Sequence, residues 1–210
     1  MKLYQVAAAP NPTRVMLYIA ERAGLGLNMG IEQVMVNPVK GEQRGPEHLA
    51  RNPFGTLPVL ELDDGDYLIE SRSIISYLED KFAEHSLLPA DLEARAKARD
   101  LERVVEVRVM NPMAHYVHAT NSPLGLKPDA KVAAQIEASL PVALGYLEDL
   151  LSDRRDMLFG DAVSIADCTL QAGCQFARFG KIDLLTDYPQ LQAWDQRYRA
   201  RPAAQAVLKF

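Results

Sequence analysis

Residues 52–70 read NPFGTLPVLELDDGDYLIE, and this stretch constrains the fold more than any other. Two apolar runs flank Asp64-Gly65, a dipeptide typical of a tight β-hairpin turn. Pro58 lies at the head of the first run, where it has no N–H to donate to a neighbouring strand. The Leu57–Pro58 bond is a candidate cis peptide, and the stretch predicts two short strands around a tight turn.

Before this hairpin, the spacing of apolar residues alternates between that of strands and that of helices. LYQVA predicts a strand, PTRVMLYIAERAG a helix that ends at Gly24, and IEQVMV a second strand, which together form a β-α-β unit. A Gly- and Pro-rich segment follows, and after the hairpin Ser71 begins a helix with an apolar stripe at helical spacing. The first half therefore predicts the order β-α-β-α-β-β-α.

Strand patterns stop near residue 87, and long helical patterns replace them. The expected helices are Leu92 to Thr120, Asp129 to Ser152, Ser164 to Phe179 and Tyr188 to Ala200. A boundary marked by Pro89 predicts an α/β domain over residues 1–84 and an all-α domain over residues 91–210. Pro112 and Pro141 are expected to kink their helices without ending them.

Composition is that of an ordinary globular protein, with 48% apolar and 24% charged residues. The net charge of -5 argues against a nucleic-acid partner, because phosphate backbones are bound by clustered Lys and Arg. No signal peptide or membrane-spanning run is recognisable, so a cytoplasmic protein with no membrane partner is expected. Cys168 and Cys174 lack metal-site or redox spacing, which predicts buried free thiols and no metal.

Four segments resemble the cytosolic glutathione S-transferases. NPFGTLPVLELDDG is similar to their Asn-Pro-x-Gly-x-x-Pro-x-Leu segment, and IESRSIISYLED resembles their Glu-Ser-x-Ala-Ile helix start. SIADC resembles the capping box of their helical domain, and YPQLQAWDQRYRARPA resembles their last helices. The resemblance covers essentially the whole chain and implies a thioredoxin-like N-terminal domain, glutathione as co-substrate and a homodimer.

The resemblance implies that Leu57, Pro58, Glu70 and Ser71 bind glutathione. The backbone of Leu57 would pair with an extended peptide, whereas the alternative is that Pro58 merely protects a sheet edge. At the start of a helix, Ser71 can hold a carboxylate with its hydroxyl and backbone N–H, while Glu70 takes an ammonium. The alternative is a plain helix cap at Ser71 beside an exposed Glu70.

Gln43 and Arg44 resemble, in part, positions where related classes place His and Lys to hold the glycine carboxylate. An Arg can pair with a carboxylate through two hydrogen bonds, and the Gln amide can donate one more. A solvated loop charge is the alternative for this pair.

The opposite wall is expected from the first long helix of the second half, where Val109, Met113, Tyr116 and Val117 recur at helical spacing. This stripe either lines an apolar electrophile site, with His115 and Tyr116 as polar contacts, or packs in the core. Trp194 is expected in the core. Ser164 and Asp167 are expected to cap a helix without a role at the site.

The loop PNPTR, residues 10–14, contains no Ser, Cys, Tyr or His. Pro10 occupies the place where phi-, theta- and delta-like transferases carry a serine, and Asn11 resembles the asparagine of the bacterial Nu class. We expect Asn11 to be the N-cap of the first helix, followed by Pro12. The Asn11 NH2 would stabilise the glutathione thiolate, with Thr13 as the second candidate donor.

These residues favour a glutathione-dependent transferase with two open branches. One is conjugation of an apolar electrophile, and the other is reduction of a small disulfide or peroxide through the bound thiol. The Nu-like asparagine favours the second branch. The alternative is a non-catalytic protein of the same fold, either an interaction protein similar to a bacterial starvation protein or a carrier of apolar ligands.

Overall fold

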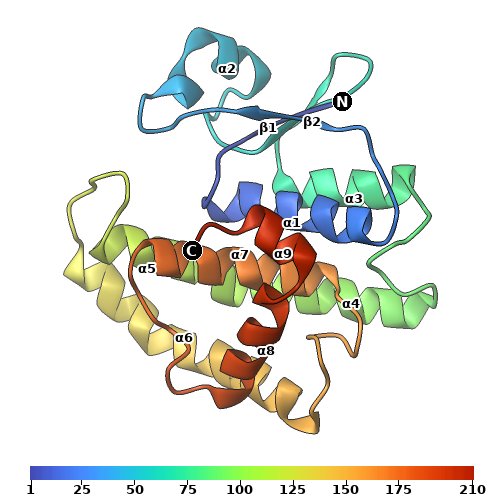
Figure 1. The fold of residues 1–210 in the computed structure, drawn as a ribbon. Coiled ribbons are helices and arrows are strands. Elements are labelled where there is room, and N and C mark those ends of the chain that lie inside the picture. The colour runs from blue at the N-terminus through green and yellow to red at the C-terminus, as the bar shows by residue number, and fades with distance from the viewer.

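A four-stranded sheet forms the centre of the N-terminal domain in the computed structural model, which describes residues 1–210 (Figure 1). Its strands are β1 (Lys2–Gln5), β2 (Glu32–Met35), β3 (Val59–Glu61) and β4 (Tyr67–Leu68), in the order β2-β1-β3-β4. β1 and β2 are parallel, and the other neighbours are antiparallel. The predicted β-α-β unit and hairpin are thus confirmed, with Gly65 at φ 92° in the turn.

The helices of this domain are α1 (Pro10–Gly24), a 3-10 turn (Glu42–Arg44), α2 (Pro46–Arg51) and α3 (Ser71–Lys81). In Figure 1, α1 and α3 lie together on one face of the sheet, and α2 lies on the other side. Leu3, Leu17 and Ile74 are fully buried between the sheet and these two helices. The order β-α-β-α-β-β-α is therefore confirmed, and the domain is thioredoxin-like as expected.

The second domain is all-helical, as predicted. Its helices are α4 (Leu92–Val105), a π-helical turn (Glu106–Met110), α5 (Asn111–Thr120), α6 (Ala130–Leu150), a 3-10 turn (Leu151–Asp153), α7 (Ile165–Phe179), α8 (Pro189–Arg199) and α9 (Pro202–Val207). α7 lies at the centre, buried along most of its length. Sequence patterns did not predict the short α9 as a separate helix.

The predicted helix from Leu92 to Thr120 is not one regular α-helix. It is helical throughout, but the π turn, which ends two residues before Pro112, separates α4 from α5. Pro112 has no N–H to donate to the carbonyl of residue 108, so the regular ladder cannot pass through this point. α6, in contrast, continues across Pro141 as expected.

The two domains share one hydrophobic core. A single cluster of 34 buried residues runs from the sheet through α1 into the helical domain. α1 packs against α7 and α9, so the first helix of the α/β domain is also part of the domain junction. None of the helices is both long and apolar enough to cross a membrane.

Candidate functional site

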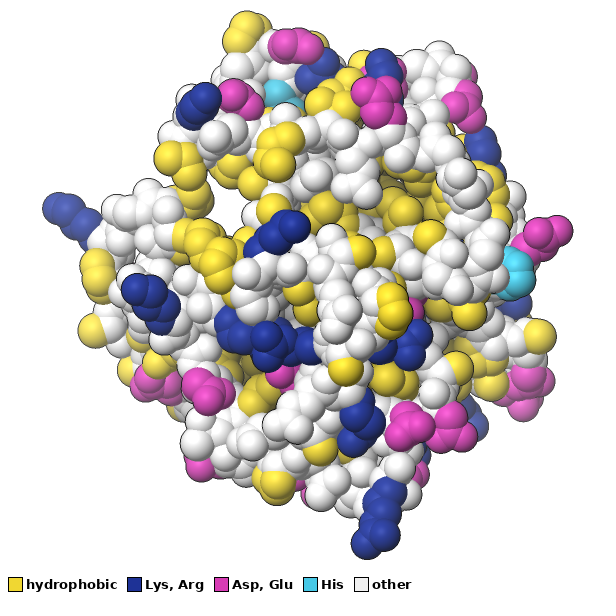
Figure 2. All heavy atoms as spheres, viewed as in Figure 1, with side chains coloured by type: hydrophobic (Ala, Val, Ile, Leu, Met, Phe, Trp, Pro, Cys, Tyr) yellow, Lys and Arg dark blue, Asp and Glu magenta, His cyan; other side chains and the backbone are white.

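A cavity of about 480 Å³ lies at the junction of the two domains. The N-terminal domain lines it with residues that include Asn11, Gln43 and Leu57, and the helical domain with residues that include His118 and Phe176. Figure 2 shows an opening bordered by apolar side chains between the domains. The cavity therefore joins the loop before α1 to the ends of α5 and α7.

Asn11 reaches this cavity from the first turn of α1. The helix begins at Pro10 with Ala9 as its N-cap, because the Thr13 N–H donates to the Ala9 carbonyl at 3.0 Å. The expected N-cap role of Asn11, with Pro12 following it as the first helical residue, is thus wrong. Proline has the φ that a first helical residue needs, and here Pro10 takes that position. Asn11 keeps its side chain free to accept a hydrogen bond from Ser71 at 3.0 Å.

Leu57 also lines the cavity, and the bond to Pro58 is cis as expected. The backbone N–H and C=O of Leu57 form no hydrogen bond within the chain. The preceding turn is held rigidly, because the Asn52 amide donates to the Thr56 carbonyl at 3.0 Å. A free donor and acceptor on a fixed extended segment can pair with another extended peptide.

Ser71 begins α3, and Glu70 before it is the N-cap residue, exposed and without side-chain partners. The buried Ser71 hydroxyl accepts from Arg14 at 2.9 and 2.6 Å and donates to Asn11 at 3.0 Å. A hydroxyl donates one hydrogen bond and accepts two, so these partners use its full capacity. Within the chain, the Ser71 hydroxyl therefore bonds to Arg14 and Asn11, and the Ser71 backbone N–H forms no hydrogen bond.

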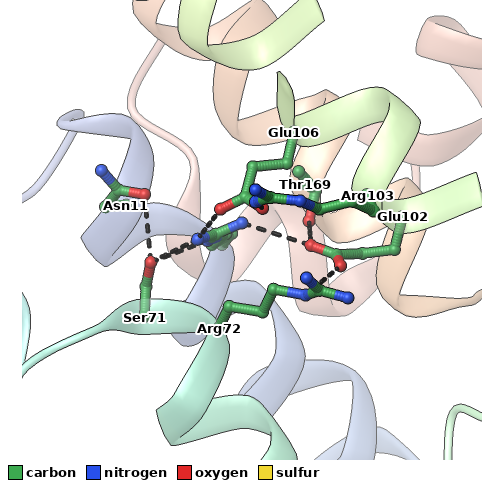
Figure 3. Close-up of polar contacts among 8 residues, drawn as sticks. Asn11, Ser71, Arg72, Glu102, Arg103, Glu106 and Thr169 are labelled. Carbon is green, nitrogen blue, oxygen red and sulfur yellow. Dashed lines mark hydrogen bonds and ion pairs between the residues drawn. The ribbon is translucent and has the colours of Figure 1, made fainter. Parts of the chain in front are cut away.

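Arg14 belongs to a buried ion network that spans the domain junction, and Figure 3 labels its partners Ser71, Glu102 and Glu106. Its guanidinium pairs with Glu102 at 3.2 Å and with Glu106 at 2.7 Å. Burial raises the pKa of Glu102 despite the nearby Arg14 and Arg72 guanidiniums. Burial acts the same way on Glu106, but Arg14 and Arg103 outweigh it and lower the pKa. The network ties α4 and the π turn to the start of α3.

Gln43 and Arg44 differ in their placement. Gln43 lines the cavity, and its buried Oε1 has no hydrogen-bond partner in the chain. A buried acceptor without a partner is costly, which favours a donor supplied from the cavity. Arg44 is exposed and does not line the cavity.

None of the five residues expected on the opposite wall lines this cavity: Val109, Met113, His115, Tyr116 and Val117. Val109 and Met113 are fully buried in the core, where Met113 packs on Gly173 of α7. His115 is exposed, and the Tyr116 hydroxyl bonds to the Glu137 carboxylate. The core alternative is thus correct for Val109, Met113 and Val117, which are fully buried, whereas Tyr116 is only partly buried.

The wall is formed instead by residues that include His118, Leu124, Phe176 and Phe179. The His118 ring packs on Phe176 with centroids 5.3 Å apart, and its Nδ1 lies 2.9 Å from the Ser122 hydroxyl. Burial, aided by His115, lowers the pKa of His118 below 6.5. His118 is the one ionisable side chain of the cavity wall. Sequence reasoning missed it, although a His-Ser pair four residues apart at a helix end was visible.

Other expected residues are structural. Thr13 is fully buried, accepts a hydrogen bond from Gln175 at 3.1 Å and does not line the cavity. Ser164 and Asp167 form the predicted capping box, and Asp167 also accepts from the buried Trp194 at 2.8 Å. The two cysteines are buried free thiols, as predicted.

Two family models match this sequence. Residues 3–86 match the glutathione S-transferase N-terminal domain, and residues 115–209 match the C-terminal domain. The chain belongs to the glutathione S-transferase family. Glutathione S-transferases are enzymes that use glutathione as co-substrate, which agrees with a cavity that begins beside a thioredoxin-like sheet.

Relatives of this glutathione S-transferase match it along its length. Glutathione S-transferase 2 of Saccharomyces cerevisiae is 30% identical over 216 residues, covering 100% of this chain and 90% of the relative. Probable glutathione S-transferase GSTF2 of Oryza sativa is 34% identical over 213 residues, covering 99% and 95%. A crystal structure of a glutathione S-transferase domain-containing protein from Marinobacter aquaeolei is 33% identical with a TM-score of 0.85, covering 97% of this chain and 100% of that one.

Proposed function

We propose that this transferase binds glutathione in the junction cavity and ionises its thiol. The thiolate then attacks an apolar electrophile or reduces a small disulfide or peroxide. The observation that carries the proposal is the shared cavity: Asn11 and Leu57 line it on one side, and Phe176 lines it on the other. Asn11, Gln43 and the Leu57 backbone thus supply polar groups for the peptide, and Leu124, Phe176 and Phe179 supply apolar surface for the second substrate.

Glutathione would lie across the N-terminal domain. The unpaired backbone of Leu57 pairs with its cysteinyl unit, and the backbone N–H groups at the start of α3, Ser71 first, hold the γ-glutamyl carboxylate. Glu70 takes the ammonium of the same group. The Gln43 NH2 donates to the glycine carboxylate, its Oε1 accepts from a glutathione N–H, and the exposed Arg44 adds charge at longer range.

The protein must stabilise the thiolate. A thiol of pKa about 8.5 needs about 2.7 kcal/mol to shift by two units. The N-terminus of α1 supplies about 0.3–1 kcal/mol, and more when partly buried. One hydrogen bond from the Asn11 NH2 to a charged sulfur adds about 1.5–3 kcal/mol, enough to complete the shift.

His118 is the proposed acceptor of the thiol proton. Its lowered pKa leaves the ring neutral at pH 7, so one nitrogen is available to take the proton. The thiolate then forms an S–C bond as the electrophile releases its leaving group with the electron pair. On a disulfide it forms a mixed disulfide and releases the other half as a thiolate.

Calorimetry with glutathione, followed by turnover assays on a panel of substrates, tests this function. The panel contains a halonitroarene, a small disulfide and a hydroperoxide, which separate conjugation from reduction. We expect binding and turnover of at least one class. Binding without turnover of any would instead support the ligand-carrier or interaction alternative, and no binding would exclude the proposed glutathione site.

We also propose that the protein is a homodimer. Several large apolar side chains are strongly exposed on the single chain, among them Phe54 at 73%, Leu92 at 79% and Val142 at 79%. A second copy that covers such side chains would remove apolar surface from water. Sedimentation should give twice the chain mass of 23.3 kDa, and a species of single-chain mass at all concentrations would contradict the proposal.

A further inference from the structure

The carbonyl oxygen of Thr56, directly before Leu57, accepts hydrogen bonds from two buried side chains. The Asn52 amide donates to it at 3.0 Å, and the Nε2 of His48 lies 3.0 Å from the same oxygen. Because a carbonyl can only accept, the His48 Nε2 must carry the proton and donate it. A carbonyl oxygen has two lone pairs, so these two donors use its full capacity and fix its direction.

This direction also determines where the Leu57 N–H points. The Thr56 C=O and the Leu57 N–H belong to one peptide unit, which is trans, since the cis bond is the next one along the chain. In a planar trans peptide the C=O and N–H bonds point in opposite directions. The Thr56 oxygen faces His48 of α2 and Asn52 directly after it, so the Leu57 N–H faces away from α2. Leu57 lines the cavity, whereas no residue of α2 does.

Packing alone does not account for a histidine at position 48. The side chain is 3% exposed, and its Nδ1 is buried without a hydrogen-bond partner. An unpartnered buried acceptor lowers stability, whereas an apolar ring of similar shape would fill the same space without that loss. The one hydrogen bond that the His48 ring forms is the one to Thr56.

We infer that His48 is a positioning residue that aims the Leu57 N–H at bound glutathione. This inference rests on the proposed pairing of the Leu57 backbone with the cysteinyl unit and names a group that fixes this backbone from behind. His48 does not line the cavity, so it acts on glutathione only through the peptide unit that joins Thr56 to Leu57. A donor held in its bound direction needs no reordering when the ligand arrives, which strengthens binding.

The distinguishing variant is His48→Phe, which keeps a buried ring and removes the donor. We expect the dissociation constant of glutathione, measured by calorimetry, and its KM to rise by about 3- to 10-fold. The kcat should be unchanged, because the Leu57 contact holds substrate and transition state equally. The free energy of unfolding should stay the same or rise, because the unpartnered Nδ1 is gone. A merely structural role would instead lower the stability and leave the dissociation constant of the folded protein unchanged.

Two amide variants test whether the reach of the donor matters. The side-chain nitrogen of Gln lies as many bonds from the backbone as the Nε2 of His, whereas that of Asn lies one bond closer. We therefore expect His48→Gln to keep the wild-type affinity and His48→Asn to lose it as His48→Phe does. His115→Phe, at an exposed position outside the cavity, is the control and should change neither affinity nor KM. Equal affinities in the Gln and Asn variants would contradict the inference.

The amide proton of Leu57 reports the contact itself. In the wild type its magnetic resonance signal should move downfield when glutathione is added, because the N–H gains an acceptor. At saturating glutathione the same movement should be smaller in His48→Phe. An equal movement in both proteins would show that the Leu57 N–H is aimed without His48.

The outcomes distinguish this inference from the proposed function. An unchanged dissociation constant in folded His48→Phe overturns the positioning role and leaves the proposed glutathione site intact. Failure of the wild-type protein to bind glutathione overturns both. Should His48→Phe not fold, the comparison of His48→Gln with His48→Asn decides, because both carry the same amide group.

Discussion

Asn11 is the residue on which the proposed chemistry depends most, and a change of one atom tests it. Asn11→Asp keeps an oxygen toward Ser71 but replaces the NH2 donor with a negative charge. Because Asn11 does not cap α1, stability should be nearly unchanged. Losing a hydrogen bond to a charged sulfur should raise the bound thiol's pKa by about one to two, and the added charge should raise it further.

The matched control for this change is Asn37→Asp, which places the same charge on the wall of the same cavity. Its effect should be smaller, because the Asn37 side chain already accepts from the Val39 and Lys40 backbone N–H groups and Asn37 is not part of the first turn of α1. An equal rise in both variants would mean that any negative charge in the cavity suffices, and that Asn11 is not a specific donor.

The lowered pKa of His118 predicts how the activity depends on pH. Its pKa lies below 6.5, so the ring is neutral at pH 7 and takes up a proton only as the pH falls below that value. The folded state then binds fewer protons at His118 than the unfolded state, so folding stability also falls in this direction. We expect kcat/KM to decline below pH 6.5 in the wild type and His118→Gln to lose this decline along with much of the activity.

His115→Gln is the control for that profile, because His115 lies exposed on the same helix outside the cavity. It should keep the wild-type decline apart from a small shift, since His115 only adds to the lowering of the His118 pKa. An unaltered profile in His118→Gln would show that another group takes the proton.

The two cysteines should be unreactive in the native protein. Cys168 is fully buried and Cys174 is 3% exposed, and burial raises the pKa of Cys174 to about 12. The thiolate is the reactive form, so neither residue should react with a disulfide reagent until the chain unfolds. Titration should detect no thiol in the native protein and two after denaturation. Rapid labelling of the native protein would contradict this burial.

At the scale of elements, the stability of α7 and of its packing depends on Asp167. Besides forming the capping box with Ser164, this carboxylate accepts from the Leu158 N–H and the Trp194 ring, each at 2.8 Å. Asp167→Ala leaves these buried donors without partners, which should lower the free energy of unfolding by about 2–4 kcal/mol. Urea titration followed by circular dichroism measures the loss, and the KM for glutathione should stay within error.

Asp129→Ala provides a comparison for that prediction. Asp129 caps α6 from an exposed position and accepts only from two backbone N–H groups. Its loss should cost about 0.5–2 kcal/mol, the usual effect of a helix cap. Similar losses in the two variants would mean that the contacts of Asp167 beyond its capping box contribute little.

At the scale of the whole molecule, α1 makes the two domains one cooperative unit. Residues such as Arg14 and Thr13 are buried only because α7 and the carboxylates of the helical domain cover them. A fragment of residues 1–84 would expose a charged network and an apolar helix face, so we expect it not to fold. In the full chain, circular dichroism and Trp194 fluorescence should give the same urea midpoint. A folded fragment or two separate midpoints would contradict this coupling.

The order of the elements was predictable because it depends on local patterns. The hairpin around Asp64-Gly65, the helix end at Gly24 and the capping box at Ser164 each use residues a few positions apart. Backbone preferences and apolar spacing act over that range, so the sequence showed them directly. Leu57 could be placed at the cavity because its segment carries a family motif, and Gln43 because its position resembles, in part, one that related classes use.

The residues that the helical domain contributes to the opposite wall of the cavity could not be predicted from such patterns. A π turn before Pro112 shifts the hydrogen-bond ladder of the long helix, and close packing on Gly173 turns the stripe of Val109 and Met113 into the core. His118 and Phe176 then face the cavity from helices that are far apart in the chain. Likewise, the direction of the Asn11 amide follows from Ser71 and Arg14, because a hydroxyl's single proton is assigned only when its neighbours are brought together.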